Sequence, residues 1–260
     1  MKLSSLLRTA ALPLWKGKAY ERTAYRNVEE FISIVGDMDA SEVKTITLDK
    51  WYEVQGKKVS PVTINRKLVN INQVLQYAHD REWLGKMPVL KWNPENNGRI
   101  RWLEPHEEAK MFSLLVQWGE TEVAKFLRIL LETGMRRGEL LGLTPENVQG
   151  RWIRLWKTKT KTPRSVPLTD VALTSLEGFS GWLIDINDLR RVWDKLRVEM
   201  GLSDDKDFVL HSLRHTKATR MLSKTQNIAM VQKLLGHKKV QTTLRYAHIS
   251  DDDLLNAVCN

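Results

Sequence analysis

Apolar and polar residues recur with a helical period over most of the first 85 residues. Three segments carry this pattern, at 19–36, 47–55 and 60–85. The first ends on Gly36, the second begins at a candidate cap, Thr47, and the third has Pro61 in its first turn, where proline is favoured. The pattern predicts an all-helical lobe over residues 1–90, with its first helix beginning near residue 19.

The next stretch breaks the period. Residues 85–100 are rich in Pro, Asn and Gly and show no sustained periodicity, which is typical of a connection between lobes. We therefore expect a linker at 91–100 and a second lobe over 101–260.

The second lobe combines helices with a short hairpin. Helical periodicity returns at 103–118, 121–134, 180–201, 212–224 and 227–236. Gly134 and Gly236 follow the ends of two of these helices, and Ser212 is the expected N-cap of another. Alternation around residues 152–156, followed by SVPL at 165–168, predicts two antiparallel strands. The expected fold is mainly α with a small antiparallel β-sheet, in two lobes: one all-α, one mixed α/β.

Composition narrows the class of protein. The 260 residues contain 41 Lys and Arg against 31 Asp and Glu, a net charge of +10, which favours a nucleic acid over a membrane as partner. No apolar run approaches the ~18 residues that span a bilayer. A lone cysteine, Cys259, excludes an internal disulfide and predicts a cytoplasmic protein, and the start of the chain lacks the features of a secretory signal. The six histidines match no metal motif, so we expect neither metal nor cofactor.

Positive charge is concentrated near the C-terminal end. No acidic residue lies between Asp207 and Asp251, and Tyr246 stands among lysines, histidines and Arg245. A phenol has a pKa near 10, and nearby cations favour its ionised form. The pattern predicts an anionic ligand near Tyr246.

Further upstream, single residues point to the same chemistry. His211 and Arg214 are three residues apart and share one helical face. Arg136 follows a glycine-terminated helix, and Glu139 is expected to be a salt-bridge partner that steadies the next helix. His215 and His248 are interpreted as local hydrogen-bonding residues.

The order of these motifs is more specific than any one of them. TG-x-R with Glu139, a lysine-bearing hairpin, H-x-x-R, LLGH and a tyrosine nine residues after His237 follow one another. This order resembles the tyrosine recombinase (phage integrase) family of site-specific DNA recombinases over residues ~100–250. The N-terminal lobe is weakly similar to the family's DNA-binding core-binding domain. One departure is Arg137-Gly138, where the family more usually has an apolar and a small residue.

The resemblance implies a catalytic set and a role for each member. The set is Arg136, Lys159, His211, Arg214, His237 and Tyr246. Tyr246 would attack phosphorus to form a 3′-phosphotyrosine, while the arginines hold the phosphate oxygens. Lys159, chosen over its neighbours by counting back from Val166-Pro167, would protonate the leaving 5′-oxygen. His211 would be a general base or orienter, and His237 would hydrogen-bond the phosphate.

Partners follow from the same resemblance. We expect double-stranded DNA, contacted by Arg66, Lys67, Lys157, Lys161, Arg164, Lys238 and Lys239. A homotetramer across two DNA sites would form through the C-terminal tail, whose apolar residues are Leu254, Leu255 and Val258. Accessory DNA-bending or directionality factors would complete the assembly. The favoured biology is integration and excision of a phage or other mobile element in a bacterial cytoplasm.

Two alternatives remain open at this point. A type IB topoisomerase uses similar chemistry, although LLGH, the HxxR box and the apolar tail favour a recombinase. A non-catalytic sequence-specific DNA-binding protein derived from a recombinase is the other, and the complete set of six residues argues against it. A covalent protein–DNA adduct would separate an enzyme from a binder.

Overall fold

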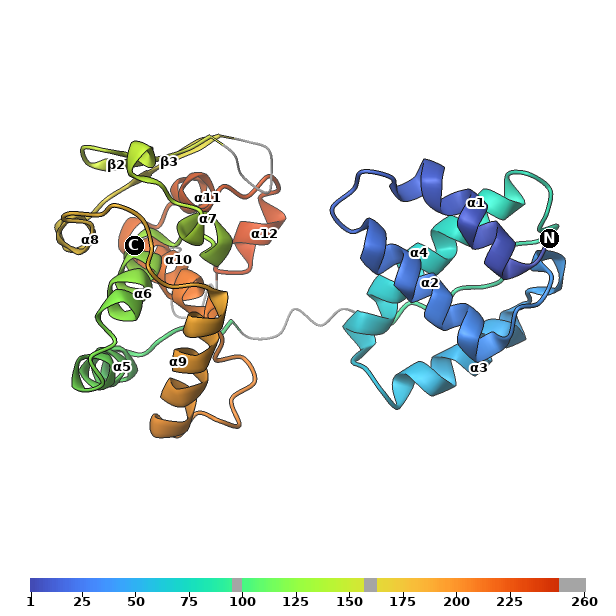
Figure 1. Cartoon of the computed structure of the whole chain (residues 1–260), viewed down its shortest axis with the longest axis horizontal. Helices are drawn as coiled ribbons and strands as arrows, with labels where there is room; N and C mark the ends of the chain where they lie inside the picture. The colour runs from blue at the N-terminus through green and yellow to red at the C-terminus, as the bar shows by residue number, and fades with distance from the viewer. Residues whose placement is uncertain (95–99, 157–162, 248–260) are drawn as a thin grey trace, which may run out of the picture. The chain divides into compact units, whose positions relative to one another are not determined.

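The computed structural model describes residues 1–94, 100–156 and 163–247. The chain divides into two compact units, Met1–Asn97 and Gly98–Asn260, shown in blue to cyan and in green to red in Figure 1. The division falls within the segment expected to be a linker. The predicted fold class is confirmed, because helices dominate and the strands form one small antiparallel sheet. None of the helices in the described ranges is long and apolar enough to cross a membrane.

Four α-helices build the part of the first unit that the structure describes, residues 1–94. They are α1 (Leu3–Trp15), α2 (Glu21–Val35), α3 (Thr45–Gly56) and α4 (Pro61–His79), with a 3-10 turn at Ala40–Glu42. The prediction that the first helix begins near residue 19 is wrong. The buried positions of α1 include Leu3, Leu6, Leu7 and Ala10, an amphipathic spacing that leaves Arg8 exposed on the other face.

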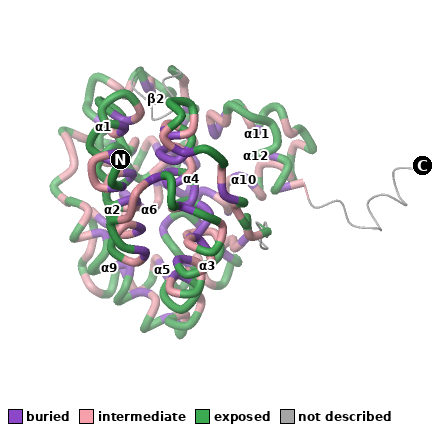
Figure 2. The backbone as a smooth tube through the Cα atoms, turned by 90° about the vertical axis from the view of Figure 1, so that its right-hand side faces the viewer, coloured by how far each residue is buried: buried purple, intermediate pink, exposed green. Residues whose placement is uncertain are grey.

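The ends of these helices differ in how well local sequence predicts them. Ser60 accepts the backbone N–H of Thr63, and Pro61 opens α4 as expected. The predicted cap Thr47 instead lies inside α3, where its hydroxyl accepts the N–H of Lys44 at 3.2 Å. Figure 2 shows how buried and exposed positions alternate along α4, whose buried side packs on α2.

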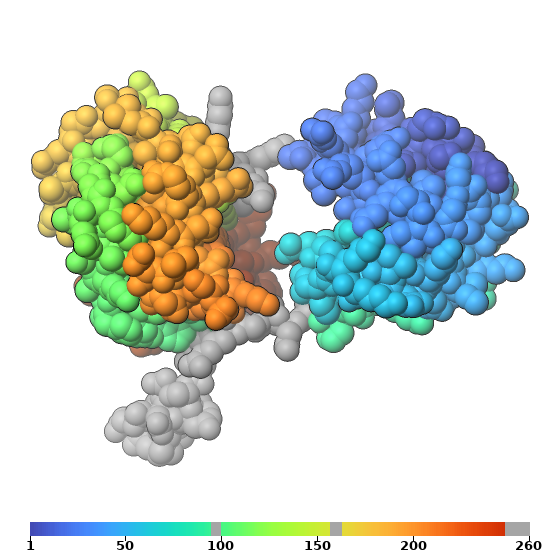
Figure 3. All heavy atoms as spheres, turned by 60° about the horizontal axis from the view of Figure 1, so that its bottom comes forward, coloured from blue at the N-terminus to red at the C-terminus, as the bar shows by residue number. Residues whose placement is uncertain are grey.

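The second unit holds eight further α-helices within the described residues. They are α5 (Pro105–Gln117), α6 (Thr121–Thr133), α7 (Arg137–Leu141), α8 (Asp170–Ser175), α9 (Ile186–Glu199), α10 (His211–Thr225), α11 (Ile228–Leu235) and α12 (Gln241–Leu244). Helix α6 is central, because it contacts α5, α7, α8, α9 and α10 and buries Phe126, Ile129 and Leu130. In Figure 3, α5 (green) and α9 (orange) form part of one surface of this unit.

The sheet has three antiparallel strands in the order β1 (Val148–Gln149), β2 (Trp152–Leu155) and β3 (Arg164–Pro167). Ile153 pairs with Val166, and both side chains are fully buried against the helices. The predicted hairpin is therefore confirmed, although β2 ends one residue before Trp156. Its connection, residues 157–162, lies outside the described residues.

Two glycines end the helices that matter for the site. Gly134 after α6 and Gly236 after α11 have φ of +64° and +65°, the left-handed conformation predicted for a helix end. The prediction of Ser212 as an N-cap is wrong. Helix α10 begins at His211, and Ser212 lies inside it with no exposed area, because the packing of this first turn into the core overrides the local capping preference.

Candidate active site

A buried carboxylate organises one half of the candidate site. Glu139 in α7 accepts the backbone N–H of Arg136 at 2.9 Å and pairs with its guanidinium at 2.9 Å. Arg164, at the start of β3, donates to both oxygens of the same carboxylate at 2.8 and 2.7 Å. Burial raises the pKa of Glu139, but the two guanidiniums outweigh it and lower the pKa to about 2. The expected role of Glu139 as a salt-bridge partner is confirmed.

Arg214 is held in a different way. Its side chain is 1% exposed, and its guanidinium donates to the carbonyls of Gly134 and Leu235 at 2.6 Å each. These carbonyls lie at the C-terminal ends of α6 and α11, where the helix dipole is negative. Burial, with Arg136 and Arg164 nearby, lowers its pKa to about 10, so the group is still charged at neutral pH.

Three of the predicted residues line one cavity. Arg136, His211 and Arg214 surround a space of about 470 Å³, together with Met135 and Leu210. Desolvation and the Arg214 and Arg136 guanidiniums lower the pKa of His211, although part of its side chain remains exposed. Two guanidiniums facing one space can bind an anionic group such as a phosphodiester. Within the described ranges, no cluster of three His, Cys, Asp or Glu side chains is placed to hold a metal.

Tyr246 follows α12 and forms the other half of the site. The side chain is 5% exposed and packs with apolar residues that include Ala218 and Val231. Its hydroxyl lies 2.8 Å from Nδ1 of His215. Burial raises the pKa of Tyr246, although Arg214 and Arg245 act in the opposite direction. The cations therefore act in the expected direction, but desolvation outweighs their attraction and the net pKa is raised.

His237 lies beside the tyrosine. The two rings are parallel to within 5°, with centroids 6.4 Å apart, and Nδ1 of His237 is 2.9 Å from the hydroxyl of Thr243. Burial and the neighbouring arginines lower the pKa of His237 to about 4. His237 is thus a neutral hydrogen-bonding group between α11 and α12.

His215 has a more specific partner than the sequence predicts. The sequence predicts a local hydrogen-bonding residue, but the structure places it on the hydroxyl of Tyr246, 31 residues away. A signal was available, since His211 and His215 are four residues apart and share a helical face. Their ring centroids lie 4.7 Å apart.

The predicted DNA-binding residues divide into three groups. Lys157 and Lys161, with the catalytic candidate Lys159 and the histidine at 248, lie outside the described residues. Arg66, Lys238 and Lys239 are exposed, and their DNA contacts stay predictions. Lys67 pairs with Glu30 at 2.5 Å and Arg164 with Glu139, so both cations are engaged within the protein. These ion pairs show a stabilising role for Lys67 and Arg164, and their phosphate contacts stay predictions.

Comparisons with known proteins agree with this arrangement. The integrase of Escherichia phage P2 is 26% identical over 253 residues, which cover 94% of this chain and 73% of that protein. Tyrosine recombinase XerA of Saccharolobus solfataricus is 28% identical over 257 residues, covering 90% of this chain and 82% of the relative. The Tn1549 transposon integrase, solved with circular intermediate DNA, has the same fold, with a TM-score of 0.79, 18% identity and 99% of both chains covered.

A family model gives the classification. The model of the phage integrase family matches residues 101–253, which is more than half of the chain. That range contains both halves of the site, and the match confirms the resemblance of the motifs. The chain therefore belongs to the phage integrase family and is a tyrosine recombinase, a site-specific recombinase.

Proposed function

We propose that this recombinase cleaves and rejoins duplex DNA through a covalent 3′-phosphotyrosine at Tyr246. One observation carries the proposal: within little more than one turn, α10 supplies His211 and Arg214 to the cavity and His215 to the hydroxyl of Tyr246. The anion-binding space and the nucleophile are thus tied to the same rigid element. A phosphate in the cavity would lie against α10, which also contacts the phenol through His215.

The chemistry follows from the groups present. Arg136 and Arg214 bind the non-bridging oxygens, whose negative charge grows in the transition state. The oxygen of Tyr246 forms a bond to phosphorus while the bond from phosphorus to the 5′-oxygen breaks. Lys159 donates a proton to that leaving oxygen, and His237 hydrogen-bonds the phosphate. A 5′-hydroxyl from another strand reverses the step, which exchanges strands without loss of the bond energy.

The biological setting is integration and excision of a phage or other mobile element. This choice is supported by the names of relatives, which include a phage integrase and a transposon integrase. We propose that four copies act across two DNA sites in the cytoplasm of a bacterial host. The net charge of +10 favours the polyanionic partner.

Capture of covalent adducts tests the reaction. A pool of random-sequence duplexes is incubated with the protein in EDTA, denatured with detergent, and the DNA that stays on protein is sequenced. We expect adducts at discrete sequences from the wild type and none from Tyr246→Phe. Tyr20→Phe, which alters an exposed tyrosine of the first unit, is the control and should leave adducts intact. Salt-sensitive complexes without any adduct would instead support the DNA-binding alternative.

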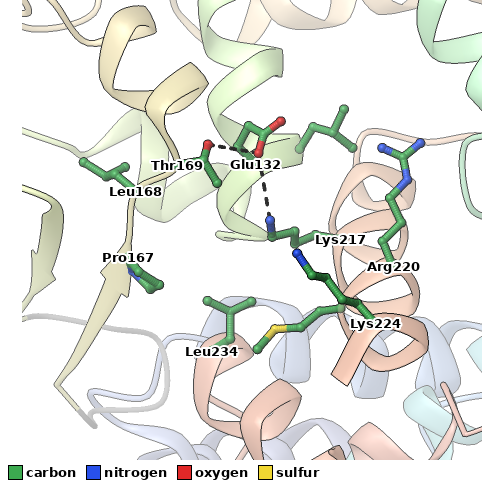
Figure 4. A pocket seen from close by; sticks show the side chains of 10 residues that line it. Glu132, Pro167, Leu168, Thr169, Lys217, Arg220, Lys224 and Leu234 are labelled. Carbon is green, nitrogen blue, oxygen red and sulfur yellow. Dashed lines mark hydrogen bonds and ion pairs between the residues drawn. The ribbon is translucent and has the colours of Figure 1, made fainter. Parts of the chain in front are cut away.

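Self-association is proposed to use a separate pocket of the second unit. Figure 4 shows a cavity of about 440 Å³ between the end of β3 and helix α10, with an apolar lining that includes Leu131, Leu168 and Leu234. Lys217, Arg220 and Lys224 from α10 stand at its edge. We propose that the C-terminal tail of a neighbouring copy docks here.

The sequence of the tail matches the pocket. Three consecutive aspartates at 251–253 precede Leu254 and Leu255, so acidic groups would meet Lys224 while the leucines enter the apolar lining. Lys217 and Arg220 already pair with Glu132 and Glu108, and the aspartates would add to these contacts. Residues 248–260 lie outside the described residues, so the argument rests on their sequence.

Truncation and charge substitution test the docking. Deletion after Ser250, or Leu254→Asp with Leu255→Asp, should abolish oligomers on DNA as measured by mass photometry. Leu183→Asp, at a side chain that is 85% exposed, should leave them unchanged. Oligomers that persist after the deletion would rule out the tail as the contact.

A further inference from the structure

The nucleophile has a protein partner that none of the assigned roles uses. The hydroxyl of Tyr246 and Nδ1 of His215 are 2.8 Å apart, and the two rings are tilted by 51° with centroids 5.6 Å apart. His211, one turn earlier in α10, lines the cavity with Arg136 and Arg214 instead. The histidine that contacts the phenol is therefore distinct from the histidine that faces the phosphate-binding space.

The protonation states in this contact are set by burial. Burial, with the neighbouring His211, Arg245, Arg214 and His237, lowers the pKa of His215 to about 3. At neutral pH its imidazole is uncharged and one ring nitrogen carries a lone pair. The phenol is also uncharged, because burial raises its pKa. The tautomer with hydrogen on Nε2 then lets Nδ1 accept the phenolic hydrogen.

We propose that His215 is a catalytic residue that accepts the proton of Tyr246 as the phenol attacks phosphorus, a role that rests on the proposed function. The O–H bond of Tyr246 breaks, its proton moves to Nδ1, and the electron pair of the oxygen forms the bond to phosphorus. The bond to the 5′-oxygen breaks with its electron pair, and that oxygen receives a proton from Lys159. On rejoining, the imidazolium returns its proton to the departing phenolate.

The surrounding charges make this transfer depend on DNA. Without a bound anion, the cations around His215 oppose a charged imidazole, so the phenol keeps its proton. A phosphodiester bound by Arg136 and Arg214 brings negative charge to the same cluster and offsets their repulsion. The proton acceptor becomes effective when the phosphate is in place, which keeps the free protein from holding a reactive phenolate.

Two substitutions separate a proton acceptor from a simple hydrogen-bond partner. His215→Asn places an amide near the position of Nδ1, so it keeps a hydrogen bond but cannot take up a proton. His215→Ala removes both functions. Single-turnover cleavage of a nicked duplex recovered by adduct capture should slow by about 10²-fold or more in both variants at neutral pH. The rate of His215→Asn should rise with pH as hydroxide replaces the lost acceptor.

A modified substrate distinguishes this role from that of the general acid. A duplex with sulfur in place of the bridging 5′-oxygen has a leaving group that needs no proton. It should restore cleavage by Lys159→Ala but leave the defect of His215→Asn unchanged. His106→Asn, at an exposed histidine of α5, is the control and should cleave at the wild-type rate.

Two results would overturn the inference, and they differ. Cleavage by folded His215→Asn at the wild-type rate and pH dependence would show that the imidazole only holds the tyrosine. Absence of any Tyr246-dependent adduct from the wild type would refute the proposed function, and the role of His215 with it. Circular dichroism of His215→Asn establishes that the variant is folded, so that a slow rate reports on the chemistry.

Discussion

In the arginine half of the site, made of Arg136, Glu139, Arg164 and Arg214, charged hydrogen bonds hold every guanidinium. In the tyrosine half, made of His215, His237 and Tyr246, uncharged rings are joined by hydrogen bonds and stacking. Arg136 and Glu139 belong to the start of α7, Arg164 to β3 and Arg214 to α10, while the ends of α6 and α11 supply carbonyl acceptors to Arg214. The tyrosine half depends on α12, a helix of four residues.

This difference separates two tasks. Binding a phosphate requires fixed positive charge, and the arginine half provides it before DNA arrives. A nucleophile that remains ionised without substrate would invite side reactions, and the tyrosine half keeps it neutral and buried. Positive charge is therefore fixed in the half that binds phosphate, while the phenol that attacks phosphorus stays uncharged in the free protein.

Removal of the Glu139 carboxylate, which Arg136 and Arg164 share, should have the largest effect on stability. Glu139→Ala leaves Arg136 and the buried Arg164 unpaired, so the free energy of unfolding should fall by about 3–5 kcal/mol, and adduct formation should fall with it. Urea denaturation measures the first effect. Glu122→Ala, which breaks the more exposed pair with Lys125, should cost far less. Equal losses from the two variants would mean that Glu139 has no organising role.

A smaller loss of stability in the arginine half is expected from a substitution at Gly236. Gly236 has φ of +65°, and a Cβ there would lie 2.8 Å from Cδ of Arg164. Gly236→Ala should therefore lower stability by roughly 2 kcal/mol through strain and displacement of Arg164. Gly178→Ala, with φ of +68° and open space around the added methyl, measures the strain alone. If both variants lose the same stability, Arg164 adapts without cost.

Lowering the pH should destabilise the folded protein, because His215 is held neutral in the tyrosine half. The pKa of His215 is about 3 in the folded protein, below its unfolded value of roughly 6.5. The unfolded chain therefore binds more protons in that window, so stability is lost as pH falls from 6.5 towards 3. Allowing for partial exposure, the loss from His215 between pH 7 and 5.5 should be about 1 kcal/mol. Urea unfolding of His215→Asn should show a correspondingly smaller loss, and an identical loss would contradict the assignment.

The smallest expected effect is on the salt dependence of DNA binding. It distinguishes a lysine that is paired within the protein from an exposed lysine that contacts DNA. Lys238→Gln, at an exposed lysine, should reduce the slope of log affinity against log salt concentration by about 1. Lys67→Gln should leave that slope unchanged, because Lys67 is paired with Glu30. Fluorescence anisotropy on a captured duplex gives both slopes. A reduced slope for Lys67→Gln alone would reverse the assignment of the two lysines.

Much of the site follows from short-range spacing. His211 and Arg214 share a helical face, Gly134 and Gly236 end helices, and Glu139 pairs with Arg136, all of which depend on residues close in sequence. The errors have another origin. The prediction of a first helix near residue 19 omits α1, whose buried face packs against α2 and α4 and is therefore stabilised by contacts distant in sequence. Ser212 is buried by packing that local capping preferences do not describe.

The sequence by itself determined which chemical groups are present, their order, the helices that carry them and the family. Only the tertiary structure decided which groups meet, since Arg164 reaches Glu139 across 25 positions, Tyr246 reaches His215 across 31, and Arg214 reaches Gly134 across 80. It also decided their charge. A pKa depends on desolvation as well as on neighbouring charges, and desolvation is a property of the packed chain: the cations around Tyr246 are visible in the sequence, while the burial that keeps its phenol neutral is not.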